Sequence, residues 1–232
     1  MINRVTDLLS PSGLVIRGGF TPLHEDNVPL LEDGVETRTV LLVGNIDRDM
    51  WQSFQASKYW SKDSDEVVLD PLNSWTRDIV EPVAEKLSAR AIYPFDGPPY
   101  YPFLNWARRA EPVFTSPLGL SIHPEYGLWH AYRVALLFRE EIAIPFQTIA
   151  ESPCAVCVDQ PCLNGCPVNA FSNSRYDVPK CFDHLKSNEE VRCMKIGCLA
   201  RHACPVGAEH VYKPEQAQFH MVAFVDSLAE QT

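Results

Sequence analysis

The chain has no long apolar run. None of its stretches approaches the roughly 18 consecutive apolar residues that a membrane-spanning helix requires. The first residues, Met1 to Ser10, also lack the apolar core of a secretory signal peptide. We therefore expect a cytoplasmic protein with no membrane segment, in a compartment that keeps thiols reduced.

Positive charge is also scarce. The 232 residues include 20 Lys and Arg against 30 Asp and Glu, which gives a net charge of -10. Nonspecific affinity for nucleic acids comes from Lys and Arg that displace phosphate counterions, so this balance predicts no nucleic-acid partner, although a local basic face is compatible with it. Hydrophobic residues make up 46% and charged residues 22% of the chain, as is typical of a globular protein.

Cysteine is absent before Cys154 and after Cys204, and the segment between them holds the whole set. The first half follows the pattern Cys-x2-Cys-x4-Cys-x3-Cys-Pro, and the second half is spread more widely. Each half ends in a similar turn sequence, CPVNA and then CPVGA, which we interpret as a degenerate internal duplication. The eight residues are Cys154, Cys157, Cys162, Cys166, Cys181, Cys193, Cys198 and Cys204.

Eight thiolates are the number that two [4Fe-4S] clusters require, and the arrangement resembles the bacterial two-cluster ferredoxins, in which the fourth Cys of each run binds the other cluster. The first run is two residues longer here, and Cys181 stands alone upstream of the last three, which resembles the ferredoxin segment of epoxyqueuosine reductases and reductive dehalogenases. That resemblance implies two ligand sets: Cys154, Cys157, Cys162 and Cys204 for one cluster, and Cys166, Cys181, Cys193 and Cys198 for the other.

Two other uses of these thiols stay open. Disulfides would need an oxidising compartment. Structural zinc would favour separate four-cysteine sites or histidine among the ligands, and it would leave the paired Cys-Pro endings without a reason. We therefore favour two [4Fe-4S] clusters, and the extra residues in each run leave the allocation of the individual ligands open.

Strands and helices alternate in the part that precedes the cysteines. The apolar run within Thr37 to Gly44 is typical of a strand buried on both faces. Asp47 is expected to cap a helix that runs to about Trp60. Asp70-Pro71 suits the start of an amphipathic helix, which Pro82 should kink or break. The pattern predicts an α+β sandwich followed by a cluster-binding domain. The expected domains are residues 1–148, residues 149–212 with the cysteines, and a terminal helix within 213–232.

A motif upstream of the cysteines carries a second resemblance. It reads Ile122-His123-Pro124-x-Tyr126-Gly127-x-Trp129-x-Ala131-x-Arg133. This is similar to a segment of the cobalamin-trafficking chaperones of the cblC type, and the reductases named above have a related Pro-Glu-Tyr-Gly stretch. The resemblance, weaker over most of residues 1–145, implies a nitroreductase-like or flavin-reductase-like sandwich that holds a corrinoid.

The same resemblance implies roles for two charged residues. Arg133 matches an arginine that lines the corrinoid pocket, where a guanidinium can hold a carboxylate, an amide oxygen or a thiolate. The alternative is a strand arginine paired with Glu140 or Glu141. Asp96 lies where the epoxyqueuosine reductases carry an acidic residue proposed as a proton donor. The alternative for Asp96 is a carboxylate that opens a Gly-Pro turn.

Three ring side chains of the motif are further candidates for the corrinoid site. Tyr126 and Trp129 could cover the flat macrocycle by apolar contact, or they could belong to the core. His123 could face the pocket or donate a hydrogen bond to a backbone carbonyl, and we do not assign it to cobalt.

Together these features predict an iron-sulfur oxidoreductase that passes electrons from two [4Fe-4S] clusters to a corrinoid, cobalamin, in the N-terminal domain. Its partners would be the corrinoid or a small-molecule substrate and an unidentified electron donor, and the chain could form a homodimer. The alternatives are a ferredoxin-like electron-transfer protein without corrinoid, an epoxyqueuosine-reductase-like enzyme and a structural zinc protein. The sequence does not distinguish cobalamin as substrate from cobalamin as cofactor, because both uses need the same pocket.

Overall fold

The structure is a computed structural model that describes residues 1–60, 70–145, 150–172, 175–187 and 190–229. Its internal contacts divide the chain into two compact units. The sheet unit comprises Met1–Pro112 and His130–Ile149, and the cysteine unit comprises Val113–Trp129 and Ala150–Thr232. These contacts group the segment Val113–Trp129 with the cysteines, whereas the sequence placed it in the first domain. Within the described ranges, no helix has the length and apolar character needed to cross a membrane.

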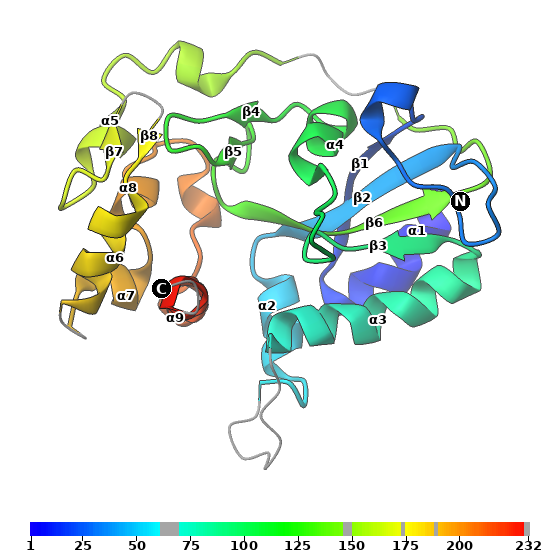
Figure 1. Cartoon of the computed structure of the whole chain (residues 1–232), viewed down its shortest axis with the longest axis horizontal. Coiled ribbons are helices and arrows are strands. Elements are labelled where there is room, and N and C mark those ends of the chain that lie inside the picture. Colours follow the sequence, from blue (N-terminus) through cyan, green and yellow to red (C-terminus); the bar gives the residue numbers. More distant parts are fainter. Residues whose placement is uncertain (61–69, 146–149, 173–174, 188–189, 230–232) are drawn as a thin grey trace. The chain divides into compact units, whose positions relative to one another are not determined.

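The sheet unit is built on an antiparallel sheet (Figure 1). Its strands are β1 (Val15–Phe20), β2 (Thr39–Ile46), β3 (Arg90–Ile92) and β6 (His130–Phe138), in the spatial order β1-β2-β6-β3. The central pair, β2 and β6, runs in register from Thr39 opposite Phe138 to Ile46 opposite His130. Every residue of β2 except Ile46 is buried, as the continuous apolar run predicted for a strand covered on both faces.

Helices cover both faces of this sheet: α1 (Ile2–Leu9) and α3 (Pro71–Leu87) lie on one side and α4 (Phe103–Ala110) on the other (Figure 1). α2 (Asp49–Gln55) follows β2 and ends before Trp60. The predicted cap at Asp47 is wrong, because Asp47 adopts a left-handed conformation with φ +55° and Arg48 takes the N-cap position. α3 continues through Pro82 as one helix. Pro82 is exposed, so water can satisfy the carbonyl that its missing N–H leaves unbonded.

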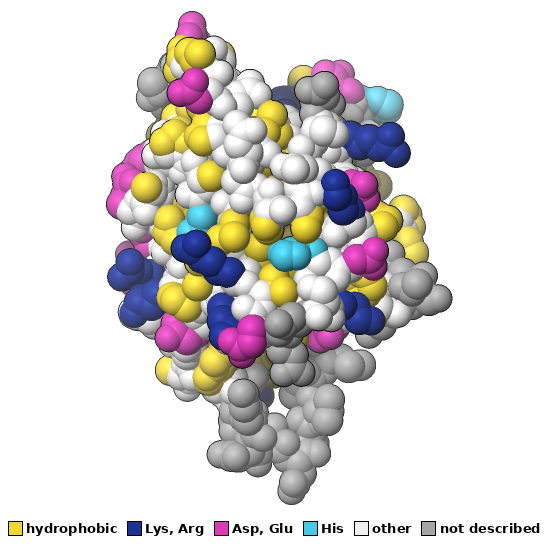
Figure 2. All heavy atoms as spheres, turned by 90° about the vertical axis from the view of Figure 1, so that its left-hand side faces the viewer, with side chains coloured by type: hydrophobic (Ala, Val, Ile, Leu, Met, Phe, Trp, Pro, Cys, Tyr) yellow, Lys and Arg dark blue, Asp and Glu magenta, His cyan; other side chains and the backbone are white. Residues whose placement is uncertain are grey.

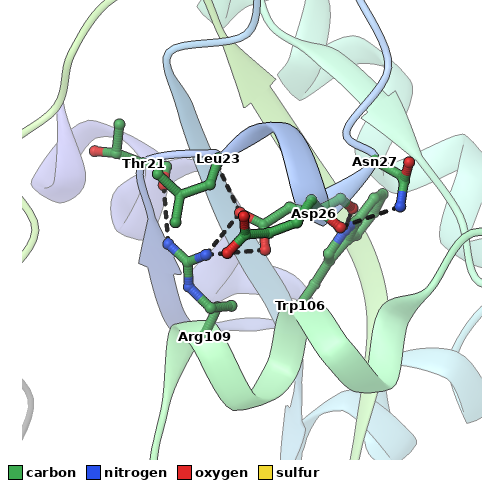
Figure 3. Close-up of polar contacts among 7 residues, drawn as sticks. Thr21, Leu23, Asp26, Asn27, Trp106 and Arg109 are labelled. Atoms are coloured by element: carbon green, nitrogen blue, oxygen red, sulfur yellow. Dashed lines mark hydrogen bonds and ion pairs between the residues drawn. The ribbon is translucent and has the colours of Figure 1, made fainter.

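Asp26 ties α4 to the loop between β1 and β2 (Figure 3). Arg109 donates to both carboxylate oxygens of Asp26, at 2.9 and 2.8 Å, and the backbone N–H of Leu23 donates to the same carboxylate at 2.7 Å. One turn earlier on the helix, Trp106 donates its indole N–H to the Asp26 carbonyl at 2.8 Å. Two side chains of α4 therefore hold one loop residue, which fixes the helix over the sheet.

The cysteine unit consists of short elements and one longer terminal helix. They are β4 (Phe114–Thr115), β5 (Ser121–Ile122), α5 (Pro161–Asn164), β7 (Phe171–Ser172), β8 (Arg175–Tyr176), α6 (Val178–Lys186), α7 (Arg192–Ile196), α8 (Leu199–His202) and α9 (Pro214–Ala229). The strands β4 and β5 pair as one hairpin, and β7 and β8 pair as another. α9 packs against α6 and α7, so the terminal helix belongs to this unit.

Single 3-10 turns complete the described chain at Ser10–Ser12, His24–Asp26, Pro153–Ala155 and Ala208–His210. An antiparallel sheet with helices that do not alternate regularly with its strands defines an α+β protein. The predicted fold class is confirmed at that level.

Candidate metal centres

All eight cysteines lie in the cysteine unit, and each is a free thiol. Cys162, Cys166 and Cys193 are buried, and the others are half-buried. No disulfide joins any of them, although disulfides were one of the open alternatives. The whole set is therefore available to bind metal.

Four of these thiols share one pocket. Cys154, Cys157, Cys162 and Cys204 line it together with the apolar side chains of Ile122, Leu128 and Val206. The chain returns from the far end of the cysteine segment to bring Cys204 beside the first three. The pocket thus offers a soft, four-sulfur donor set with apolar surroundings, which suits an iron-sulfur cluster.

Electrostatics link the same four residues. Burial raises the pKa of the Cys154 thiol, and the Cys204 and Cys157 thiolates raise it further, against a hydrogen bond from Ser152 that lowers it. Burial also raises the pKa of Cys162, with added repulsion from Cys204, Cys154 and Cys157. Such repulsion requires short distances, and a bound cationic metal would relieve it.

The other four thiols form a second group. Burial raises the pKa of Cys181, and repulsion from Cys166 and Cys193 adds to the rise. Burial likewise raises the pKa of Cys193 and Cys198, and each also interacts with members of this group. The Tyr176 hydroxyl donates a hydrogen bond to the Cys181 sulfur, which lowers the thiol's pKa in part. The structure thus brings the eight cysteines together as two sets of four.

Among the described residues, no three His, Cys, Asp or Glu side chains converge closely enough to hold a single metal ion. A cubane cluster does not require such convergence, because each of its four irons binds a different thiolate. The chemistry of the donor set and the grouping of the thiols therefore fit two clusters of four irons.

The hairpin of β4 and β5 completes the first pocket, a role that the sequence did not reveal. Ile122 and Leu128, which flank the turn of the motif, line the pocket with the cysteines. At Gly127 a Cβ atom would lie 1.9 Å from the Val206 carbonyl oxygen, and at Gly207 it would lie 2.4 Å from the Tyr126 carbonyl carbon. Two glycines therefore allow the backbone of the motif to touch the Cys-Pro-Val-Gly turn that carries Cys204.

Arg133 lies in the sheet unit and holds α3. Its guanidinium donates to the Leu72 carbonyl at 3.0 Å, to the Asn73 side chain at 2.9 Å and to the Thr76 hydroxyl at 2.7 Å. It also lies 5.8 Å from the centre of the Phe95 ring. Arg133 therefore has a structural role in holding α3. Its contact with a corrinoid stays a prediction.

The three ring side chains of the motif lie in the cysteine unit. His123 accepts the backbone N–H groups of Glu125 and Tyr126 at its Nδ1, at 3.1 and 3.3 Å, so at this nitrogen it acts as an acceptor and not as a donor to a carbonyl. Its ring stacks on Tyr126, with ring centres 4.4 Å apart. Trp129 is 1% exposed and packs edge-on against Tyr212. These contacts shape the turn of the motif, and a role at a corrinoid stays a prediction.

Asp96 lies in the sheet unit and accepts hydrogen bonds from two sides. Arg77 forms an ion pair with its carboxylate, and the backbone N–H of Tyr93 donates to it at 3.1 Å. The backbone N–H of Asp96 in turn donates to the Tyr93 carbonyl at 3.1 Å, so Asp96 closes the turn that precedes the Gly-Pro sequence. Delivery of a proton from Asp96 stays a prediction.

A buried charged group in the sheet unit was not predicted. Arg17 and Glu111 form an ion pair at 2.9 Å, with side chains only 2% and 5% exposed. Tyr132 donates its hydroxyl to the same carboxylate and also lines a groove with Tyr101 and Phe103. Burial raises the pKa of Glu111 despite the lowering influence of Arg17 and Tyr132. Sequence gave no signal for this group, because its members come from three distant elements.

The face seen in Figure 2 has no single basic area. Lys and Arg side chains are separated there by Asp, Glu and apolar side chains. On this face the described residues therefore lack the concentrated positive charge that dominates binding to a phosphate backbone.

Comparison with known proteins identifies relatives in fold. No family model matches the chain, and no curated protein matches its sequence. The B12-trafficking protein CblC of C. elegans has a similar structure, with a TM-score of 0.56 and 18% identity over 94% of this chain and 90% of that one. Identity at this level shows likeness of fold alone.

Epoxyqueuosine reductases are also similar in fold. One, solved with an epoxyqueuosine-modified tRNA-Tyr stem loop, gives a TM-score of 0.51 at 15% identity and covers 94% of this chain and 71% of that one. A selenomethionine-labelled epoxyqueuosine reductase gives 0.51 at 14% identity over 93% and 68%. Both resemblances inferred from the motifs are thus supported at the level of fold. The tRNA bound to the first reductase is in tension with the expectation of no nucleic-acid partner.

Proposed function

We propose that this chain is an iron-sulfur redox protein that passes electrons from two [4Fe-4S] clusters to a corrinoid bound by the sheet unit. The observation that carries the proposal is the gathering of eight free thiols into two sets of four. Cys154, Cys157, Cys162 and Cys204 would hold one cluster, and Cys166, Cys181, Cys193 and Cys198 the other. Bound clusters would supply one-electron transfer at a potential tuned by charge, hydrogen bonds and exposure.

Metal analysis of protein purified without oxygen tests the first half of the proposal. We expect about eight irons and eight sulfides per chain from the two-cluster stoichiometry, with paramagnetic signals on reduction. Cys154→Ser should remove signals of one cluster and Cys181→Ser those of the other. Val158→Ser, at a residue 94% exposed in the first cysteine loop, is the matched control and should keep both. A colourless protein that contains zinc would refute this half.

The corrinoid half is supported by the fold shared with CblC and by the motif that contains Arg133. Arg133 would hold a polar group of the ligand, and His123, Tyr126 and Trp129 would be further contacts of the macrocycle. Asp96 would deliver a proton where reduction of a substrate consumes one. The product would be a processed cobalamin or a small substrate reduced with its help.

Titration of the anaerobic protein with cobalamin tests this half, because displacement of the lower base and reduction of cobalt both change the visible spectrum. We expect saturable binding that weakens about tenfold or more in Arg133→Lys, since a lysine keeps the charge but loses the planar fork. Arg139→Lys is the control, because Arg139 follows the same strand and pairs with the exposed Asp33. Eight irons with no spectral response would instead favour a ferredoxin-like electron-transfer protein.

A second candidate is an epoxyqueuosine-reductase-like enzyme. It is favoured by the fold shared with the reductase bound to a tRNA stem loop and opposed by the net charge of -10. Conversion of epoxyqueuosine to queuosine in a tRNA stem loop by the reduced, cobalamin-loaded protein would establish it. Absence of turnover, with both clusters present and cobalamin bound, would exclude it.

A further inference from the structure

Ser116 places an unpartnered hydroxyl at the first cysteine pocket. The residue is 5% exposed, and its Oγ is buried with no hydrogen-bond partner among the described residues. The side chain lines the pocket together with Cys154 and Cys204. A buried hydroxyl without a partner is unfavourable, and native structures rarely retain one without a reason.

The hairpin of β4 and β5 fixes the position of this hydroxyl. The backbone N–H of Ser116 donates to the Leu120 carbonyl at 2.9 Å, and its own carbonyl accepts the N–H of Gly119 at 2.9 Å. Both backbone groups are thus satisfied within the hairpin turn, and only the hydroxyl is left over. The contact between Gly127 and Val206 then holds the hairpin against the turn that carries Cys204.

We infer that the Ser116 hydroxyl donates a hydrogen bond to a sulfur of the cluster held by Cys154, Cys157, Cys162 and Cys204, and thereby raises its reduction potential. The inference rests on the proposed function. Reduction adds one negative charge to a cluster, so a fixed donor stabilises the reduced form more than the oxidised form.

The second set of thiols has a hydroxyl group near it that comes from a different part of the chain. Tyr176 comes from β8 within the cysteine segment and packs, together with the proposed ligand Cys181, against one buried cluster. Ser116 comes from a segment that precedes every cysteine in the chain. The potentials of the two clusters can therefore be adjusted separately, one through Ser116 and the other through Tyr176.

Midpoint potentials of both clusters, measured by spectroscopically monitored redox titration of the full anaerobic chain, test the inference without any catalytic assay. Signals are assigned with Cys154→Ser and Cys181→Ser. Ser116→Ala should keep eight irons and shift the potential of the first cluster to a more negative value, with the second unchanged. Tyr176→Phe should shift the potential of the second cluster to a more negative value and leave the first unchanged.

A matched pair guards against a packing effect of the alanine. Thr and Val have nearly the same shape, so Ser116→Thr should preserve the wild-type potential while Ser116→Val lowers it. Eight irons with identical first-cluster potentials in the Ala variant and the wild type, or in the Thr and Val variants, would overturn the role of Ser116 alone. A wild-type protein that holds no iron would overturn this inference and the proposed function together.

Discussion

The two units of this chain bury different kinds of side chain. In the sheet unit, most of the buried side chains of β2 and β6 are apolar, and Val40, Leu42 and Leu136 are completely buried. In the cysteine unit, the larger apolar cluster is centred on Cys162 and Cys166, with small partners such as Ala200. The sheet unit has an ordinary hydrophobic core, whereas the core of the cysteine unit includes several cysteines that are proposed metal ligands. The comparison teaches that the stability of the cysteine unit should depend on what its thiols bind.

Removal of iron should give the largest effect and the sharpest separation of the units. Binding of a structural metal contributes on the order of 10 kcal/mol in small metal-dependent domains. We expect the apo protein to lose hydrogen-exchange protection throughout α5 to α8 and to retain it in β2 and β6, which peptide-resolved mass spectrometry can measure. If the cysteine unit kept its protection without metal, the contrast between the units would be mistaken.

The next effect concerns the buried ion pair of the sheet unit. Glu111→Ala should destabilise this unit by about 3–5 kcal/mol, because it removes the carboxylate that balances Arg17 in a dry environment. Denaturant unfolding followed by tryptophan fluorescence measures the loss, and iron content should stay at the wild-type value. The double variant Arg17→Met with Glu111→Leu is the control and should recover much of the stability. A loss of iron in the single variant would show that the two units are not independent.

Much of the sheet unit could be read from the sequence, because its signals are local. The apolar run of β2 and the Asp70-Pro71 start of α3 both lie in the predicted places. The predicted helix cap at Asp47 was wrong, because capping depends on backbone dihedrals that the residue type does not determine. The ion pair of Arg17 and Glu111 could not be predicted, because the two residues lie far apart in the chain and no local pattern indicates that they meet.

In the cysteine unit, the number of thiols was visible, but the rest of the pocket was not. The grouping of Cys204 with the first three cysteines came from a resemblance and not from spacing. The hairpin that carries Ser116 looked like part of the first domain, because its partner, the turn at Val206, lies far along the chain. Gly127 was part of a recognised motif, yet its physical reason, a close backbone approach, appears only in three dimensions.

Gly127→Ala should have an intermediate effect, and it tests the close backbone approach of Gly127 to Val206. A Cβ at this position would overlap the Val206 carbonyl, and φ is already +56°, a conformation that costs about 1–3 kcal/mol for a residue other than glycine. We expect the variant to lose iron from the cluster that includes Cys204 and to keep the other, as iron analysis and paramagnetic spectra would show. Gly119→Ala is a matched control, because Gly119 has φ +76° but no atom within 4 Å of the added Cβ. Equal iron loss in both variants would trace the effect to backbone strain and not to the contact with Val206.

The smallest effect is a pH dependence that only the sheet unit should show below neutral pH. Burial raises the pKa of Glu111 above its ordinary 4.5, so between that value and its folded-state pKa the folded protein retains a proton that the unfolded chain has released. The free energy of unfolding must then fall as pH rises through this window, by at most about 1.4 kcal/mol per pH unit. Burial instead raises the pKa of Cys181 and Cys198 above 9.0, so these two thiols of the apo cysteine unit titrate only in alkaline solution. Denaturant unfolding of the wild type and of Glu111→Gln across pH 4–7 measures how the free energy of unfolding changes with pH. The Gln variant should lack the slope caused by Glu111. A slope of opposite sign would mean that the attraction of Arg17 outweighs burial and that Glu111 stays ionised inside the fold.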